Sequence, residues 1–153
     1  MSEDLRKLST PILIVEDEED HARLIIKALV ENGTSLNEIF HIDNGLDALQ
    51  YLNRTGKFTD RDHHCPALVI LDVKMPMKNG FEVLEEIKTN EKLKKIPVVM
   101  LTTTSTSEDI DRAMSLGAND YIVKPVKFAD FTQKVSKLGY YWGKVSDAKK
   151  IFC

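Results

Sequence analysis

Five short apolar runs, separated by longer amphipathic stretches, constrain the fold of this chain more than any other feature of its sequence. The runs are rich in β-branched residues, have the length of strands, and lie at 12–15, 38–42, 67–71, 98–101 and 121–123. Between them, apolar residues recur every three or four positions, which predicts helices. Strands that alternate with helices pair in parallel, and near-continuous apolar strands need cover on both faces. The predicted class is therefore α/β, with a doubly wound sheet of five parallel strands.

Capping residues mark the ends of the predicted helices. Asn79 stands three residues before Glu82, which makes the pair a candidate capping box at a helix start. Ser105 stands in the same relation to Glu108. Gly117 follows an apolar periodic stretch and is a candidate helix stop. These local signals agree with the periodicity about where the helices lie.

The size and charge of the chain narrow its classes of function. Its 153 residues suit one compact domain, and a net charge of -3 gives no broad cationic field, so nucleic acid is not expected as a direct partner. The first ten residues mix both charge signs, and the longest apolar runs have strand length, so we expect neither a signal peptide nor a membrane span. A disulfide between Cys65 and Cys153 would constrain little structure, and a reducing, cytoplasmic location is predicted.

The residues that can do chemistry lie just beyond the apolar runs. Glu16 and Asp17 follow the first run, and Asp72 follows the third. Thr102 follows the fourth run, and Lys124 follows the fifth. In a sheet of this class, ligands bind outside the carboxyl ends of the strands. We therefore expect three carboxylates, a hydroxyl and an ammonium to converge at one edge of the sheet.

A group of three carboxylates is unstable without a cation, because like charges repel. Glu16, Asp17 and Asp72 offer the oxygen ligands that Mg²⁺ prefers, with Mn²⁺ as an alternative. Asp72 is then the candidate nucleophile towards phosphorus, since carboxylates form acyl phosphates once charge on the incoming group is neutralised. Lys124 and Thr102 would donate hydrogen bonds to phosphoryl oxygens and stabilise the transition state.

Four motifs carry a resemblance to a known family. They are ILIVEDEED at 12–20, LVILDVKMPMKNG at 68–80, VVMLTT at 98–103 and DYIVKP at 120–125. Through these motifs, in this order and spacing, the chain resembles the CheY-like receiver domain of two-component response regulators over residues 10–138. The resemblance implies a flavodoxin-like fold of alternating strands and helices with strand order 2-1-3-4-5.

The resemblance also implies a role for each acidic residue of the site. Asp72 would accept a phosphoryl group from a histidine kinase or a phosphotransfer protein. Glu16, Asp17, Asp72 and the backbone carbonyl of Lys74 would hold Mg²⁺. A chain of this kind is a signalling switch, and it is not expected to be an enzyme beyond catalysing its own phosphorylation and dephosphorylation.

The resemblance further implies how phosphorylation is transmitted. Lys124 and Thr102 would bind the phosphoryl group, and Tyr121 would move inward as Thr102 follows it. This movement would reshape the surface of the fourth helix, fifth strand and fifth helix. Gly80 and Pro125 are expected to be scaffolding. Gly80 stands where a side chain would crowd a helix start. Pro125 has the family's context for a cis peptide bond but could also simply end the strand, and the sequence does not choose between the two isomers.

Two features qualify the resemblance. Glu16 stands where many relatives have Asp, and its extra methylene suggests that it contacts metal through water. Lys74 and Thr104 lie two residues beyond Asp72 and Thr102, at positions that border the path of hydrolytic water in relatives. The lifetime of the phosphorylated state therefore stays open.

The ends of the chain are expected to be extensions of the receiver domain. Residues 1–9 would precede it, and 139–153 would prolong the fifth helix without forming an output domain, so a stand-alone regulator is predicted. Apolar residues continue a helical spacing there, and the candidates for a partner or dimer contact are Phe131, Val135, Leu138 and Trp142. The alternative is that Trp142 folds back on its own domain. The loop at 54–66 and the aromatic tail further resemble regulators that partner bacterial phytochromes, so a phytochrome kinase is a candidate partner.

Other functions are weighed against the switch. An aspartyl phosphatase also uses a strand-end Asp and Mg²⁺, but such enzymes place a second Asp where this chain has Lys74. A pseudo-receiver keeps the fold without accepting phosphate, and the presence of Asp17, Asp72 and Lys124 disfavours it. Flavin binding is disfavoured because the acidic segment after the first strand is a poor neighbour for a phosphate. The sequence does not distinguish a relay shuttle from a terminal messenger, because both use the same chemistry, and a relay is slightly favoured.

Overall fold

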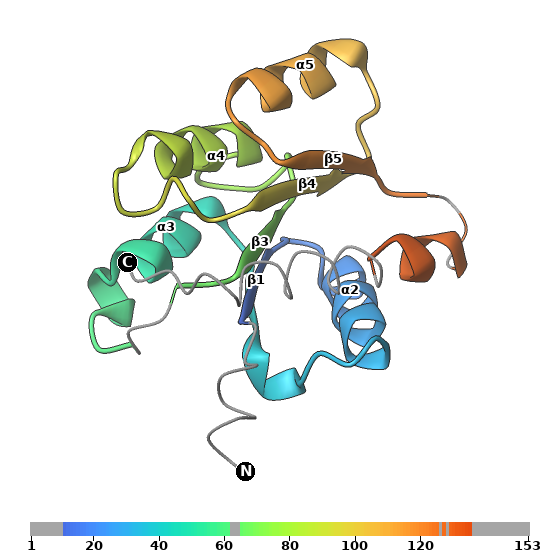
Figure 1. The fold of residues 1–153 in the computed structure, drawn as a ribbon, viewed down its shortest axis with the longest axis horizontal. Helices are drawn as coiled ribbons and strands as arrows, with labels where there is room; N and C mark the ends of the chain where they lie inside the picture. The colour runs from blue at the N-terminus through green and yellow to red at the C-terminus, as the bar shows by residue number, and fades with distance from the viewer. Residues whose placement is uncertain (1–10, 62–64, 126, 128, 136–153) are drawn as a thin grey trace.

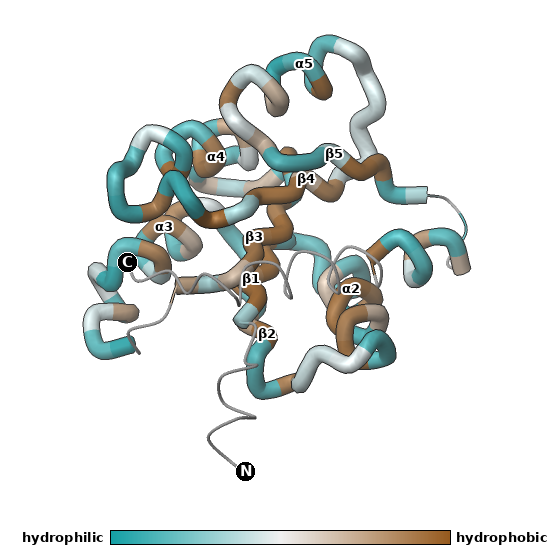
Figure 2. Tube along the Cα trace, in the orientation of Figure 1, coloured by the Kyte–Doolittle hydropathy of each residue, from teal (hydrophilic) through white to brown (hydrophobic). Residues whose placement is uncertain are grey.

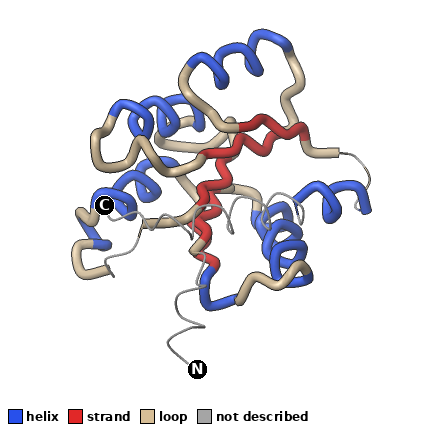
Figure 3. The backbone as a smooth tube through the Cα atoms, viewed as in Figure 1, coloured by secondary structure: helices blue, strands red, loops and turns tan. Residues whose placement is uncertain are grey.

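Parallel strands form the centre of the molecule, with helices on both sides (Figure 1, Figure 3). The computed structural model describes residues 11–61, 65–125, 127 and 129–135. The strands are β1 (Ile12–Val15), β2 (Ile39–Ile42), β3 (Leu68–Leu71), β4 (Val98–Thr102) and β5 (Asp120–Val123). They form one sheet in the order β2-β1-β3-β4-β5, and every neighbouring pair is parallel. The predicted α/β class and strand order are confirmed.

The helices lie on the two faces of this sheet, as Figure 1 shows. The α-helices are α2 (Glu19–Glu31), α3 (Gly45–Asn53), α4 (Gly80–Thr89) and α5 (Ser107–Ser115), and the short 3-10 helices are η1 (Leu36–Glu38) and η2 (Gly56–Phe58). Residues 129–135 are also helical, and we refer to them as the terminal helical segment. Among the described helices, none combines the length and the apolar character that a membrane crossing requires.

Alternate strand residues fill two separate cores, one on each face of the sheet. Leu13 and Val15 pack with residues of α3, α4 and α5, whereas Ile12 and Ile14 pack with residues of α2 and the terminal helical segment. All four residues of β1 are buried. Figure 2 shows the apolar strands between helices that carry much of the polar sequence. Burial on both faces explains why the central strands are continuously apolar rather than alternating.

The caps agree with the sequence at one helix and differ at another. At the start of α4, the amide of Glu82 donates to Asn79 Oδ1 and the amide of Asn79 donates to Glu82 Oε1, both at 3.0 Å, so the predicted capping box is confirmed. The prediction for α5 was wrong by one residue. Thr106 rather than Ser105 caps this helix, with its hydroxyl accepting from the amide of Asp109 at 3.2 Å. A Ser/Thr run offers several candidate caps, and the packing of the helix selects one of them.

The terminal helical segment corrects part of the predicted interface. Phe131 and Val135 are 4% and 0% exposed, and they pack against the sheet in the same core as α2. These two side chains therefore belong to the domain's own core and are not a free surface for a partner. Leu138 and Trp142 lie outside the described residues, as do the predicted extensions at 1–9 and 139–153.

The cysteine chemistry also differs from expectation. Cys65 lies just before β3 and is 5% exposed. It is disulfide-bonded in the structure, which differs from the reduced state that we expected from the sequence.

Candidate functional site

Backbone hydrogen bonds place the predicted site residues at the carboxyl edge of the sheet. The amide of Glu16 donates to the last carbonyl of β2 at 3.0 Å, and the amide of Asp72 donates to the last carbonyl of β1 at 3.1 Å. The amide of Lys124 donates to the carbonyl of Thr102, the last residue of β4, at 2.7 Å. Each bond continues the strand ladder by one residue. The side chains therefore leave the sheet at the same edge, as the sequence predicted.

The ammonium of Lys124 is the centre of the site. Its Nζ lies 2.6 Å from Glu16 Oε1 and 3.3 Å from Asp72 Oδ2. The side chains of Lys124, Glu16 and Asp72 are only 4%, 1% and 9% exposed, so these contacts are made almost out of water. A third contact, 2.9 Å from Nζ to His21 Nδ1, was not predicted from the sequence. Removal from water makes these charge-assisted contacts stronger than their counterparts on the surface.

The three predicted carboxylates form one group. Ligand oxygens of Glu16, Asp17 and Asp72 all lie within 4.8 Å of one another, with Asp17 on the exposed side. Lys74, whose carbonyl is the fourth predicted ligand, lies in the loop after β3. An oxygen-only donor set with a solvent-facing carboxylate suits a hard divalent cation that keeps several waters. The three carboxylates therefore fit a Mg²⁺ or Mn²⁺ site.

The pKa of Glu16 shows that the three carboxylates are stabilised by binding a cation or a proton. The pKa of Glu16 is raised from 4.5 to about 7, mainly because the carboxyl is buried and also because of the neighbouring charge of Asp72. The hydrogen bond from Lys124 acts against both effects and lowers the pKa. One ammonium therefore does not fully compensate the buried carboxylates.

The loop after β3 fixes the orientation of Asp72. The amide of Val73 donates to Asp72 Oδ1 at 2.7 Å, which leaves Oδ2 facing Lys124. Gly80 packs against this loop, because a Cβ there would overlap the carbonyl oxygen of Asp72 and lie 2.8 Å from Val73 Cα. Pro125 follows Lys124 through a trans peptide bond, since the described residues contain no cis bond. The structure therefore gives the scaffolding prediction for Gly80 a steric basis, and it has the trans isomer at Pro125, a choice that the sequence left open.

Thr102 and Tyr121 are linked through Thr104. Thr102 is fully buried, and its hydroxyl oxygen accepts from the amide of Thr104 at 3.4 Å. The Tyr121 hydroxyl donates to the carbonyl of Thr104 at 2.9 Å and lies 2.6 Å from its hydroxyl oxygen. A phenol has one proton, so the hydroxyl of Thr104 is the donor in the shorter contact. The sequence singled out Thr104 only as a neighbour of hydrolytic water, and its link to Tyr121 was missed.

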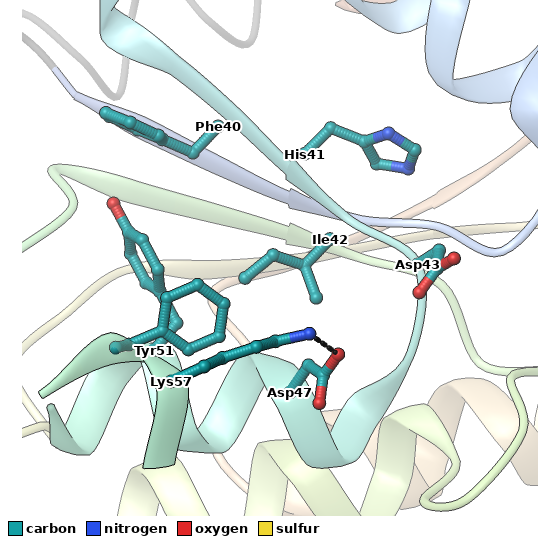
Figure 4. Close-up of a pocket in the computed structure, with 8 residues that line it drawn as sticks. Phe40, His41, Ile42, Asp43, Asp47, Tyr51 and Lys57 are labelled. Carbon is teal, nitrogen blue, oxygen red and sulfur yellow. Dashed lines mark ion pairs between the residues drawn. The ribbon is translucent and has the colours of Figure 1, made fainter. Parts of the chain in front are cut away.

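A separate pocket of about 320 Å³ lies beside the edge strand β2 (Figure 4). It is lined by Phe40, His41, Ile42, Asp43, Asp47, Tyr51, Lys57 and Phe58. The ammonium of Lys57 pairs with Asp47 at 2.8 Å across it. His41 connects the pocket to the acidic group, because its Nε2 lies 2.7 Å from the carbonyl oxygen of Glu16. None of the three carboxylates that form the candidate cation site lines this pocket.

Comparison with known proteins agrees with this geometry. The sequence model of the family described as the response regulator receiver domain matches residues 12–136. The probable methanogenesis regulatory protein FilR2 of Methanothrix harundinacea is 40% identical over 131 residues, which cover 86% of this chain and 82% of FilR2. The response regulator Rcp1 of a Synechocystis strain is 35% identical over 131 residues, which cover 86% of this chain and 87% of Rcp1.

Solved structures give the same result. The crystal structure of the phosphorylated cyanobacterial phytochrome response regulator RcpA is similar with a TM-score of 0.81 and 36% identity, covering 87% of this chain and 93% of that chain. The crystal structure of the Mn²⁺-bound form of Rcp1 is similar with a TM-score of 0.81 and 33% identity. The match covers 88% of this chain and 95% of the Rcp1 chain. The family model covers residues 12–136, which include every strand of the sheet and the three carboxylates at its edge. This chain therefore belongs to the family of response regulator receiver domains.

Proposed function

We propose that this chain is a response regulator that accepts a phosphoryl group on Asp72 and signals through the change that follows. The observation that carries the proposal is the buried contact of one ammonium, Lys124 Nζ, with both Glu16 and Asp72 inside a group of three carboxylates. This arrangement combines a nucleophile, a cation site and a fixed positive charge, which are the components that phosphoryl transfer requires.

Each residue has a definite part in the transfer. An oxygen of Asp72 attacks phosphorus in a phosphohistidine, the phosphorus–nitrogen bond breaks, and the histidine nitrogen takes its electron pair and a proton from solvent. Lys124 moves one of its N–H donors from a carboxylate to a phosphoryl oxygen, and the Thr102 hydroxyl donates to another. Glu16, Asp17, Asp72 and the Lys74 carbonyl are the residues that would hold Mg²⁺, which when bound neutralises charge on the phosphoryl oxygens.

The signal would leave the site through β4 and β5. When the Thr102 hydroxyl turns towards a phosphoryl oxygen, its long contact with the amide of Thr104 is lost. Thr104 also binds the Tyr121 hydroxyl by two contacts, so movement of Thr104 changes the position that Tyr121 prefers. We infer that Tyr121 transmits the state of Asp72 to the surface formed by α5, β5 and the terminal helical segment.

The proposed partners are a histidine kinase or a phosphotransfer protein, and the chain is proposed to be a switch rather than an enzyme. Similarity to RcpA and Rcp1 supports a kinase of the phytochrome class, because RcpA is a phytochrome response regulator. The proposal places the chain in the cytoplasm with the kinase domain. A homodimer remains part of the proposal, but Phe131 and Val135 do not contribute to its surface because they are buried in the core.

Phosphoryl transfer from a kinase is the direct test of this function. We expect a phytochrome-type histidine kinase, labelled on its histidine with radioactive phosphate, to lose the label to the wild-type chain within minutes in the presence of Mg²⁺. Asp72→Asn is the matched control and should leave the label on the kinase. If several such kinases and a small phosphoryl donor all fail to label the wild type, the chain is a pseudo-receiver.

The pH dependence of stability tests the acidic group. The pKa of Glu16 is raised on folding, so the folded chain binds this proton more tightly than the unfolded chain. The stability that this proton contributes is present below pH 4.5 and is lost as the pH rises to about 7. Mg²⁺ competes with the proton, so adding it should raise the melting temperature more at pH 8 than at pH 6.

A matched variant shows whether Glu16 is responsible for that dependence. Glu16→Gln removes the titrating group but keeps a polar side chain of the same length. We expect the melting temperature of the metal-free Glu16→Gln protein to vary less between pH 5 and pH 8 than that of the wild type. An equal pH dependence in both proteins, measured by scanning calorimetry, would show that another group dominates.

A further inference from the structure

We propose that His21 is a positioning residue for Lys124, holding the ammonium through a hydrogen bond to its Nδ1. This inference rests on the proposed function and concerns the same site. His21 is the third residue of α2 and is 103 positions from Lys124 in the chain, but Nδ1 and Nζ lie 2.9 Å apart. The imidazole is about one third exposed, with a side-chain exposure of 30%, so it lies at the rim of the site.

The chemistry of Lys124 fixes the direction of this bond. An ammonium has three N–H donors and no acceptor, so Nδ1 of His21 must be the acceptor. The imidazole proton is then on Nε2. The three acceptors around Nζ are Glu16 at 2.6 Å, His21 at 2.9 Å and Asp72 at 3.3 Å. Three acceptors match three donors, so the ammonium is held from three directions.

Two of these acceptors, Glu16 and Asp72, also take part in the proposed phosphorylation of the chain. Glu16 and Asp72 belong to the carboxylate group that fits a divalent cation, and Asp72 is the proposed nucleophile. Their contacts with Lys124 must weaken when they bind a cation or when Asp72 reacts. His21 is outside the carboxylate group and is a neutral acceptor. It is therefore the contact that can keep Nζ in place while the other two change.

Glu18 offers His21 an alternative that the proposal must exclude. Glu18 Oε2 lies 3.4 Å from Nδ1, longer than the 2.9 Å contact with Lys124, and its side chain is 63% exposed. Nδ1 cannot accept from Lys124 and donate to Glu18 at the same time. Among the described contacts of Nδ1, the two candidate partners are thus Lys124, which follows β5, and Glu18, which precedes α2. The position of the imidazole proton reports which of them Nδ1 binds.

Kinetics of three variants test the positioning role. His21→Leu removes the acceptor, whereas His21→Asn retains an acceptor oxygen at the distance of Nδ1 from the backbone. Arg23→Gln is the control on the same helix, because Arg23 pairs only with exposed Glu19 and Asp20 among the described ion pairs. With acetyl phosphate and saturating Mg²⁺, we expect His21→Leu to lower the rate constant of phosphorylation about fivefold, and His21→Asn to recover most of it.

Two kinetic results would overturn the proposal. One is a wild-type rate constant for His21→Leu. The other is an equal loss in the Leu and Asn variants, which would mean that the imidazole acts through its shape alone. The affinity for Mg²⁺, titrated separately, should be the same in wild type and His21→Leu, because His21 is not a predicted ligand.

Nuclear magnetic resonance of the unphosphorylated protein separates this proposal from the function on which it rests. Long-range correlation of ¹⁵N with the ring protons at pH 8 should show the proton of His21 on Nε2, and Lys124→Met should shift the Nδ1 resonance. A proton on Nδ1 in the wild type would assign the imidazole to Glu18 and refute the proposal. This readout needs no phosphoryl transfer, so its outcome is independent of whether Asp72 is phosphorylated.

Discussion

Replacing Lys124 with Met is expected to slow phosphorylation of Asp72 by about 100-fold. The substitution keeps most of the length of the side chain but removes the ammonium that contacts Glu16 at 2.6 Å and Asp72 at 3.3 Å. The phosphoryl group would then lose a fixed positive charge in a site where little water can replace it. The rate constant is measured with acetyl phosphate at saturating Mg²⁺ by the change in intact mass with time.

The same substitution should also destabilise the metal-free protein. Glu16 and Asp72 would be left buried without a compensating charge, which costs about 3 kcal/mol in the free energy of unfolding at pH 8. Lys88→Met is the matched control, because Lys88 binds the carbonyl of Ile96 at 2.7 Å, outside the site. Lys88→Met should lower stability without lowering the phosphorylation rate. A Lys124→Met protein that reacts within about threefold of wild type would contradict the role given to the ammonium.

Gly80→Ala should destabilise the protein by about 3 kcal/mol and disturb the site at the same time. A Cβ at Gly80 would overlap the carbonyl oxygen of Asp72 and lie 2.8 Å from Val73 Cα. These atoms are backbone and cannot rotate away as a side chain could. The loop after β3 must therefore shift, and with it the Val73 amide that holds Asp72 Oδ1. Urea unfolding gives the stability, and the rate with acetyl phosphate gives the effect on Asp72.

Gly33 provides the contrast for this experiment. It has a positive φ of 100°, but a Cβ there would meet nothing within 4 Å. Gly33→Ala should therefore cost only the backbone strain, about 1 kcal/mol, and leave the phosphorylation rate unchanged. If Gly80→Ala is no more destabilising than Gly33→Ala and reacts normally, the close packing of α4 against the Asp72 loop is not important for the site.

Much of the sheet could be predicted from the sequence because its three central strands, β1, β3 and β4, are buried along their whole length. The run at 12–15 coincides with β1, and all of its residues are buried. Strand ends were less accurate, since the predicted run at 67–71 begins one residue before β3. Hydrogen bonding to neighbouring strands decides these ends, and a single sequence does not contain that information.

The chemistry of the site was also predictable where residues follow strands directly. Glu16, Asp72 and Lys124 needed only the rule that parallel strands end at one edge. His21 was missed because its contact with Lys124 depends on how the first turn of α2 is oriented over the sheet. The available signal was a polar residue four positions after Asp17, on a helix that begins beside the acidic group.

Helical periodicity alone misled the prediction of the interface. Phe131 and Val135 belong to a series of apolar residues at helical spacing. Periodicity alone does not show which members of such a series cover the sheet and which extend beyond it. The structure places both in the core that contains Ile12 and Ile14. The face of the sheet opposite α3, α4 and α5 therefore needs these side chains, and a dimer cannot use them without opening the domain.

The intact mass of the wild type and of Asp72→Asn, after incubation with acetyl phosphate and Mg²⁺, tests the central claim most directly. We predict that the wild type gains one phosphoryl group and that Asp72→Asn gains none. A parallel sample with a chelator in place of Mg²⁺ should also show no gain. The claim is contradicted if the wild type remains unmodified with both acetyl phosphate and a phosphorylated kinase, or if Asp72→Asn is modified to the same extent.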